Sequence, residues 1–155
     1  MAYTLDSCQR DIVMKHNPQV IAFMTPFPHT IDADAPLADA HKIMREHRFR
    51  HLPVTSHEGI IGVLTDRDIN LVLAPDSDRP DERDLKVRDA FIEKPCIVPA
   101  STPVARVARL MAENHIGSAI VTKHEKLVGI FTVTDACRAL AEVLHDHDDE
   151  PDIVA

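Results

Sequence analysis

A pair of side chains with the spacing Thr-x-x-Asp occurs twice in this chain, as Thr65 with Asp68 and as Thr132 with Asp135. In each copy the threonine ends an apolar run that opens with glycine, and a helical pattern follows. A carboxylate one turn into a helix can accept two hydrogen bonds from a ribose diol. The free N–H groups and positive dipole end of that helix also suit a phosphate. The two pairs are therefore candidates for binding a sugar phosphate.

The same spacing also has a structural explanation. A threonine at a strand-to-helix junction, with an acid three residues later, has the form of a capping box. Aspartate is a poorer partner there than glutamate or glutamine, but its charge still favours a helix N-terminus. The two roles are compatible, because the threonine oxygen can accept the capping bond while its hydroxyl proton points outward to a ligand. The residues alone leave both explanations open.

Residues 45–51 (REHRFRH) form the one dense basic patch in a chain of net charge −8. Cations collect at helix C-termini because they interact favourably with the helix dipole, so the patch needs no ligand to explain it. The alternative is that Arg50, His51 and Arg67 converge on a phosphate. The corresponding positions of the second half are neutral, namely Gly117, Ser118 and Thr134. We therefore expect the two sites to differ in phosphate affinity.

Other chemistries find little support in the sequence. No phosphate-binding P-loop, nucleophile elbow or closely spaced Cys/His pair occurs, and four glycines are too few for a glycine-rich phosphate cradle. The segment 145–148 (HDHD) is a possible divalent metal site, but such clusters without a fixed scaffold are usually solvated. We expect no metal site and no catalysis.

The composition also limits partners and compartment. The acidic net charge argues against general binding to nucleic acid or to anionic membranes, and no apolar run approaches membrane-spanning length. Three widely spaced cysteines do not make a disulfide framework, and the first residues lack the blocks of a signal peptide. We expect a soluble protein of the cytoplasm.

The two Thr-x-x-Asp pairs belong to a longer internal repeat. Identical residues recur 67 positions apart over much of the chain, for example Pro28/Pro95, Ala33/Ala100, Pro36/Pro103, Met44/Met111, Glu46/Glu113, Val54/Val121, Thr55/Thr122, His57/His124 and Glu58/Glu125. Ungapped self-similarity of this kind means that one supersecondary unit is present twice.

Each copy predicts the order strand, helix, strand, strand, helix. Asp34 is the expected N-cap of the first helix with Pro36 in its first turn, and Ser101 and Pro103 take those places in the second copy. The expected hairpin strands are 51–55 with 60–64 and 119–122 with 127–132, and the expected closing helices are 66–73 and 133–144.

The segments divide the chain into an N-terminal helix and lead-in (1–19), a first repeat (20–74), a charged linker (75–86), a second repeat (87–144) and an acidic, histidine-containing tail (145–155). One repeat buries little apolar surface alone, but two packed sheet to sheet make a credible core. We predict an α/β fold of two β-α-β-β-α repeats, related by a pseudo-two-fold axis, with clefts where they meet.

The runs RHLPV (50–54) and GVLTDRD (62–68), repeated more loosely downstream, resemble a tandem pair of cystathionine-β-synthase (CBS) domains. The Met24-Thr25-Pro26 entry and the Asp34-x-Pro36-Leu37 helix start fit the same family. The resemblance covers nearly all of residues 20–144, which implies a stand-alone pair. Such pairs, called Bateman modules, usually dimerise and bind adenine nucleotides or S-adenosylmethionine in clefts between the repeats. They are typically regulatory sensors without catalysis.

By position, the resemblance implies ribose binding by Asp68 and Asp135. It implies phosphate contacts for Thr65 and Thr132 and for the residues before each aspartate, Arg67 and Thr134. The backbone implied to hold the adenine is that of Thr30, Ile31, His51, Leu52 and Pro53 in one cleft, and of Ile97, Val98, Ser118, Ala119 and Ile120 in the other. The second repeat has Ala119-Ile120 in place of Leu52-Pro53, a departure that can reshape its cleft.

We therefore expect a regulatory module that senses an adenosine nucleotide (AMP, ADP or ATP), requires no cofactor and acts on an unidentified protein. The alternatives are a dimerisation module with vestigial clefts and an S-adenosylmethionine sensor. A homodimer is also expected, because two helical faces carry more apolar surface than the packing of the repeats hides. Those faces bear Ile69, Val72 and Leu73, and Ala136, Leu140 and Val143.

Overall fold

The computed structural model describes residues 18–73, 84–93 and 95–148, and its elements recur at the same offset as the sequence. The first half contains η1 (Val20–Ala22), β1 (Thr25–Pro26), β2 (Ile31–Asp32), α1 (Leu37–His47), β3 (His51–Ser56), β4 (Gly59–Thr65) and α2 (Asp66–Val72). The second half contains η2 (Val87–Asp89), β5 (Ile92–Glu93), β6 (Ile97–Pro99), α3 (Val104–Glu113), β7 (Ser118–Lys123), β8 (Lys126–Thr132) and α4 (Val133–Asp148). The predicted α/β class is confirmed, while the expected N-terminal helix lies outside the described residues.

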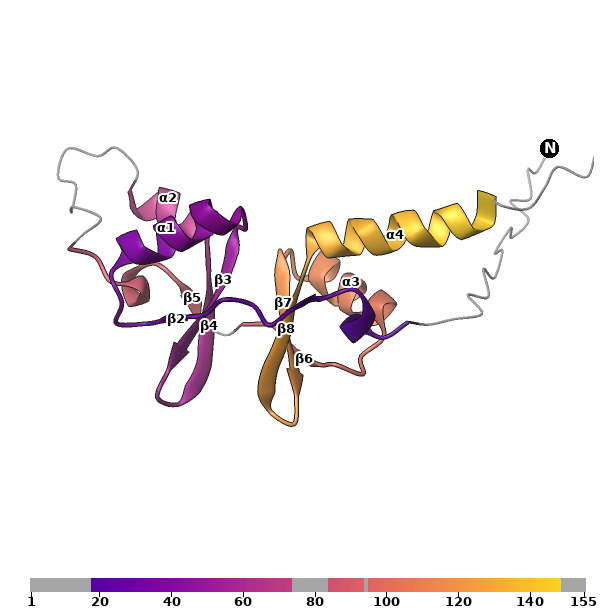
Figure 1. The fold of residues 1–155 in the computed structure, drawn as a ribbon, viewed down its shortest axis with the longest axis horizontal. Coiled ribbons are helices and arrows are strands. Elements are labelled where there is room, and N and C mark those ends of the chain that lie inside the picture. Colours follow the sequence, from indigo (N-terminus) through magenta and orange to yellow (C-terminus); the bar gives the residue numbers. More distant parts are fainter. Residues whose placement is uncertain (1–17, 74–83, 94, 149–155) are drawn as a thin grey trace, which may run out of the picture.

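The strands form two four-stranded sheets, in the orders β2-β3-β4-β5 and β1-β8-β7-β6. The hairpins β3–β4 and β7–β8 are antiparallel, whereas β2 and β6 run parallel to β3 and β7. In Figure 1 the two sheets lie side by side in the middle of the molecule, with α1 and α2 beside one and α3 and α4 beside the other. This arrangement places the C-terminal ends of β4 and β8 near the boundary between the two halves, which is called the seam below.

Each sheet takes an edge strand from the first part of the other repeat. Strand β1 pairs with β8, and β5 pairs with β4. The short helices cross over in the same way, because Val20 is buried in the core of the second half and Val87 in that of the first. The N–H of Val20 donates to the carbonyl of Thr102 at 2.8 Å, and that of Val87 to Ala35 at 3.0 Å. Neither half is complete without the other.

Helix α1 begins at Leu37, with Pro36 at the N-cap position and without a side-chain cap. The prediction that Asp34 caps this helix is therefore wrong. The N–H of Leu37 instead donates to the carbonyl of Leu85 at 2.8 Å. Backbone from the segment before the second repeat satisfies a donor that a capping side chain would otherwise take.

Helix α3 begins in the same way, with Pro103 at the N-cap position. The predicted cap by Ser101 is also wrong, because no side-chain cap is formed. The N–H of Val104 donates to the carbonyl of Pro18 at 2.8 Å, which mirrors the bond at α1.

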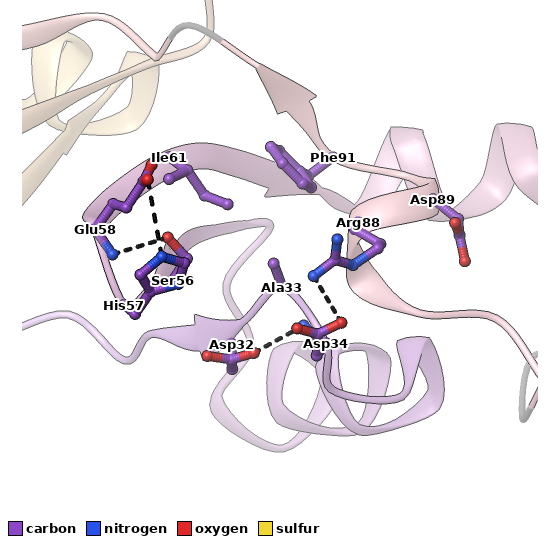
Figure 2. A pocket seen from close by; sticks show the side chains of 10 residues that line it. All are labelled: Asp32, Ala33, Asp34, Ser56, His57, Glu58, Ile61, Arg88, Asp89 and Phe91. Atoms are coloured by element: carbon purple, nitrogen blue, oxygen red, sulfur yellow. Dashed lines mark hydrogen bonds and ion pairs between the residues drawn. The ribbon is translucent and has the colours of Figure 1, made fainter.

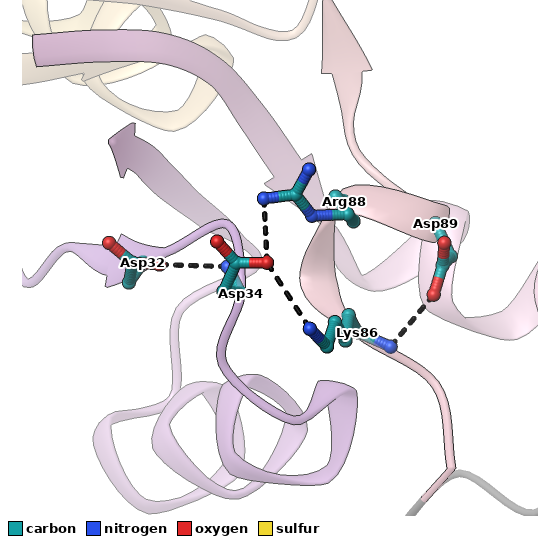
Figure 3. Close-up of polar contacts among 5 residues, drawn as sticks. All are labelled: Asp32, Asp34, Lys86, Arg88 and Asp89. Carbon is teal, nitrogen blue, oxygen red and sulfur yellow. Dashed lines mark hydrogen bonds and ion pairs between the residues drawn. The ribbon is translucent and has the colours of Figure 1, made fainter. Parts of the chain in front are cut away.

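The Asp34 carboxylate is used for a different contact, shown in Figure 3. Its Oδ1 lies 2.6 Å from the guanidinium of Arg88 and 3.3 Å from Nζ of Lys86. These hydrogen bonds, the one from Arg88 first, hold the pKa of Asp34 below its usual value. The exposed ion pairs join the turn before α1 to η2 across the boundary between the repeats.

The closing helices differ in length. Helix α2 ends at Val72, while α4 continues to Asp148, so residues 145–148 are helical and do not begin the tail expected after residue 144. Within the described part of the chain, no helix combines the length and apolar character needed to cross a membrane.

The contact between β1 and β8 can be tested at Gly129. A Cβ at this buried glycine would overlap the thioether of Met24, so the side chain or the strand would have to move. We expect Gly129→Ala to lower the free energy of unfolding by about 1–3 kcal/mol in urea titrations. In that background Met24→Ala should cost less than it does in the wild type, because it removes the overlap. An equal cost of Met24→Ala in both backgrounds would contradict this packing.

Candidate functional site

The first Thr-x-x-Asp pair forms a complete capping box. Thr65 ends β4 and caps α2, which begins at Asp66. The N–H of Asp68 donates to Oγ1 of Thr65 at 3.2 Å, and the N–H of Thr65 donates to Oδ2 of Asp68 at 2.9 Å. The structural interpretation of the motif is confirmed here.

The second pair repeats this geometry at the junction of β8 and α4. The N–H of Thr132 donates to Oδ2 of Asp135 at 2.8 Å, and the N–H of Asp135 lies 3.4 Å from Oγ1 of Thr132. Oγ1 also lies 2.7 Å from Oδ2 of Asp135, and the matching distance between Thr65 and Asp68 is 2.6 Å. An ionised carboxylate has no proton to give, so the hydroxyl donates. In this structure both threonine hydroxyls thus donate to the neighbouring aspartate and not outward.

The two carboxylates differ at their second oxygen. Oδ1 of Asp135 accepts a hydrogen bond from Nη1 of Arg138 at 3.0 Å. The described residues provide no such donor to Oδ1 of Asp68. Arg138 was missed in the sequence, although opposite charges three residues apart on a helix are expected to pair.

His51 joins the two motifs across the seam. It begins β3 and pairs with Thr65 across the hairpin. Its ring reaches the second half, because a Cβ on Gly117 would lie 2.9 Å from Nε2 of His51. The charges of both Asp68 and Asp135 act on this ring. The structure therefore brings both Thr-x-x-Asp motifs to one region around His51.

Burial lowers the pKa of His51, and the neighbouring charge of Arg50 lowers it further. Asp68 and Asp135 act in the opposite direction but do not reverse the shift. The ring is therefore neutral near neutral pH and packs against Gly117 without a charge. Gly117 leaves the space that this contact needs.

The residues expected to hold the adenine are mostly part of the core. Leu52, Pro53, Ala119 and Ile120 are fully buried, and Ile31 and Val98 nearly so. Thr30 and Ile97 are exposed, while Ser118 is half-buried opposite Thr132 in the β7–β8 hairpin. The fully buried members expose neither side chain nor backbone to a ligand in this structure, so the assignment of their backbone to adenine stays a prediction.

The basic patch divides into two parts. Arg45 and His47 lie in the last turn of α1, where the helix dipole favours cations. The ring of His47 lies 4.1 Å from that of His29 and 5.8 Å from that of Phe49, so it belongs to an aromatic cluster. Arg50 is exposed. Its carbonyl accepts the N–H of Asp66 at 3.1 Å, so its backbone lies beside the first Thr-x-x-Asp motif.

Arg67 is also exposed and lies in the first turn of α2, next to Asp68. Two exposed arginines therefore have their backbones next to the Asp68 junction. At the equivalent β8–α4 junction the N–H of Val133 donates to the carbonyl of Gly117, and Thr134 is exposed. The first junction carries more positive charge at these matched positions than the second.

Two hollows lie at the other ends of the hairpins, away from the Thr-x-x-Asp motifs. The hollow in Figure 2, of about 570 Å³, lies between the β3–β4 turn, the turn before α1 and η2, and includes Ser56, Glu58 and Arg88. A second hollow of about 320 Å³ occupies the equivalent place in the other half and includes Ser101 and His124. None of the residues predicted to bind a ligand lines either hollow, and several charged groups of the first already pair with one another.

A family model of the CBS domain matches residues 11–74 and 87–142. The chain belongs to the CBS domain family. The matched ranges include both Thr-x-x-Asp motifs, so the geometry above is that of the two CBS repeats of one chain.

Relatives of this CBS pair are found among sequences and structures. Protein YlbB of Bacillus subtilis is 34% identical over 98 residues, which span 59% of this chain and 62% of YlbB. The hexameric CBS-CP12 protein from bloom-forming cyanobacteria is 30% identical, with a TM-score of 0.74 over 84% of this chain and 76% of that one. The structure of CBSX2 in complex with AMP is 26% identical, with a TM-score of 0.68 over 81% and 98%. These likenesses confirm the predicted fold.

The neutral state of His51 makes stability depend on pH. Its folded pKa lies below the value of about 6.5 of an unfolded chain, so the unfolded state binds more protons as the solution is acidified. The contribution is fully present above about pH 6.5 and is lost as the pH falls through the folded pKa. We expect urea titrations to show a larger loss of stability between about pH 7.5 and 5.5 for the wild type than for His51→Gln.

The matched control is His57→Gln, since His57 is exposed in the β3–β4 turn. Its pH dependence should equal that of the wild type. If the free energy of unfolding changes with pH in the same way in His51→Gln as in the wild type, the seam does not hold a neutral imidazole.

Proposed function

We propose that this CBS pair is a regulatory module that binds an adenosine nucleotide at the seam between its repeats. The observation that carries the proposal is the state of Asp68. One of its oxygens completes the capping box, while the other has no donor among the described residues. A carboxylate oxygen held on a rigid junction and left free suits a ribose hydroxyl, with which it forms a charge-assisted hydrogen bond.

The surroundings of Asp68 support a phosphorylated ligand. Arg50 and Arg67 are both exposed, and their backbones lie next to the junction. Guanidinium groups match phosphate oxygens in geometry and charge. AMP is the ligand bound to CBSX2, a structural relative at 26% identity. AMP, ADP and ATP share the ribose and the phosphate, so all three fit this chemistry, and AMP is the probe we choose.

The proposed role is sensing, without catalysis and without a required cofactor. Ligand binding would change the contacts of the module with a regulated protein. S-adenosylmethionine is the second candidate ligand, because it carries the same adenosine but a cationic sulfonium in place of phosphate. The two arginines beside Asp68 favour the anionic nucleotide.

Calorimetry with AMP tests the role of Asp68. We expect Asp68→Ala to weaken AMP binding by about ten- to a hundredfold, because hydrogen bonds to a carboxylate contribute about 1.5–3 kcal/mol each. Binding of 2′-deoxy-AMP to the wild type should be weakened to a similar degree. The two losses should not add, since both remove the same interaction.

The alternative hypothesis, that Asp68 serves only the capping box, predicts a different result. If Asp68 only caps α2, Asp68→Ala lowers the free energy of unfolding and AMP and 2′-deoxy-AMP bind alike. Equal affinities across all four combinations of protein and nucleotide would therefore reject the ribose contact. Circular dichroism on each variant confirms that the comparison is made on folded protein.

We also propose a homodimer formed through the helical side of the molecule. Of the residues expected on that face, Ile69 is buried in the core and does not contribute. Four further residues expected there are only partly exposed, namely Val72, Leu73, Ala136 and Val143. Leu140 is exposed as expected, and with Val133 and Leu144 it gives α4 three apolar side chains that are 52–58% exposed. Figure 1 places α2 and α4 along the same upper side of the molecule. Large exposed apolar side chains on one helix support an interaction surface on this side.

Sedimentation velocity tests the dimer at Leu140. We expect Leu140→Glu to raise the dimer dissociation constant at least about tenfold, because an unpaired charge is costly to bury in an apolar contact. Leu110→Glu is the control, since Leu110 is a partly exposed leucine on α3 and outside the proposed face. A wild type that sediments as a monomer at micromolar concentration would reject the dimer.

A further inference from the structure

The two repeats differ at the position three residues after each aspartate. This position is Leu71 in α2 and Arg138 in α4, and the two lie 67 residues apart like the motifs themselves. The side chain of Leu71 is largely exposed. That of Arg138 reaches back to the carboxylate of Asp135 at 3.0 Å. A repeat-equivalent pair therefore gives one motif a hydrocarbon neighbour and the other a cation.

The capping geometry around the two carboxylates is otherwise the same. The threonine N–H lies 2.9 Å from Oδ2 in the first motif and 2.8 Å in the second, and the threonine hydroxyl lies at 2.6 and 2.7 Å. Oδ2 thus receives two donors in both repeats. Any ligand hydroxyl must therefore bind at Oδ1, and only the first motif leaves Oδ1 without a donor among the described residues.

Solvent access differs in the same direction. The side chain of Asp135 is 4% exposed, whereas that of Arg138 above it is 59% exposed. Asp68 is partly exposed. A ribose that approaches Asp135 must first break a charge-assisted hydrogen bond and move the guanidinium aside, while a ribose that approaches Asp68 meets an open acceptor.

We infer that Arg138 is a specificity-determining residue that closes the second motif to ribose, so that the chain binds one nucleotide, at Asp68. This inference rests on the proposed function and adds to it the choice between the two clefts. Arg138 takes one of the two lone pairs of Oδ1 in Asp135, so at most one is left there for the two hydroxyls of a ribose. The two repeats thus keep one fold and divide the roles of their carboxylates, Asp68 for the ligand and Asp135 for an internal ion pair.

Calorimetric stoichiometry with AMP on the full chain tests the inference. The wild type should bind one AMP per chain, and Asp68→Ala should remove that site while Asp135→Ala leaves it. Arg138→Leu, which copies Leu71, should add a second site, and that site should persist in Arg138→Leu/Asp68→Ala. Arg138→Met serves as a second replacement that also lacks a donor, with the same expected gain.

The reciprocal variant Leu71→Arg places a guanidinium at the equivalent position of the first repeat. It should weaken AMP binding at least about tenfold while the motif itself stays intact. Sedimentation of each variant checks that the oligomeric state equals that of the wild type, so that a change in stoichiometry reports the cleft. Both substituted side chains are largely exposed, which favours folded variants.

The outcomes separate the inference from the function on which it rests. Two AMP sites of similar affinity in the wild type, or one site that is removed by Asp135→Ala, would overturn the closing role of Arg138 and leave the nucleotide function intact. An unchanged stoichiometry of one in both Arg138→Leu and Arg138→Met would do the same. Absence of binding in the wild type and in both Arg138 variants would overturn the proposed function, and this inference with it.

Discussion

Backbone hydrogen bonds that cross between the repeats are the constraint on which the rest of this structure depends. The first part of each repeat supplies an edge strand to the opposite sheet. The residues just before each repeat supply a carbonyl to the first N–H of the opposite helix, as Leu85 does for Leu37 and Pro18 for Val104. Buried backbone groups must be paired, so these exchanges fix the position of one half against the other. The relative placement of the repeats is therefore a property of the backbone, and surface side chains are free to differ.

That placement decides the geometry of the seam. With the halves fixed, the ends of β4 and β8 approach one another, and a large ring on one side requires a glycine on the other. His51 and Gly117 satisfy this requirement. The residue equivalent to His51 in the second repeat is Ser118, and the residue equivalent to Gly117 in the first repeat is Arg50. The seam is therefore symmetrical in its backbone but not in its side chains. The imidazole lies within the electrostatic influence of both aspartates, and it stays neutral because burial outweighs their charge.

Much of the fold follows from the sequence because a constant offset is a strong signal. The order of elements, the two hairpins and the capping boxes at Thr65 and Thr132 were all expected and are present. The exchange of β1 and β5 was not expected, because strands of two residues carry no periodicity that assigns them to a sheet. Asp34 looked like a cap in the sequence, since local spacing does not reveal that Arg88 lies nearby and that Leu85 supplies the backbone acceptor.

The candidate site was predictable in its residues but not in the use of their atoms. Spacing identified Asp68 and Asp135, yet which oxygen is free depends on the hydroxyl proton of each threonine and on the rotamer of Arg138. These are properties of three-dimensional contacts between side chains on one helix turn. The comparison of equivalent positions 67 residues apart, Leu71 against Arg138, is the sequence signal that would have pointed to the difference.

A carboxylate with two oxygens explains how one residue serves the fold and the ligand together. Oδ2 must accept from threonine for the helix to begin at this place, so every copy of the motif keeps that bond. Oδ1 has no role in the cap, and its partner can therefore change without loss of the junction. Oδ2 accepts from threonine in both repeats. The two motifs therefore differ at Oδ1 and at the exposed residue that reaches it, Arg138 in the second repeat. A duplicated unit can in this way specialise one cleft by substituting a single surface side chain, while its core and its backbone exchange remain the same.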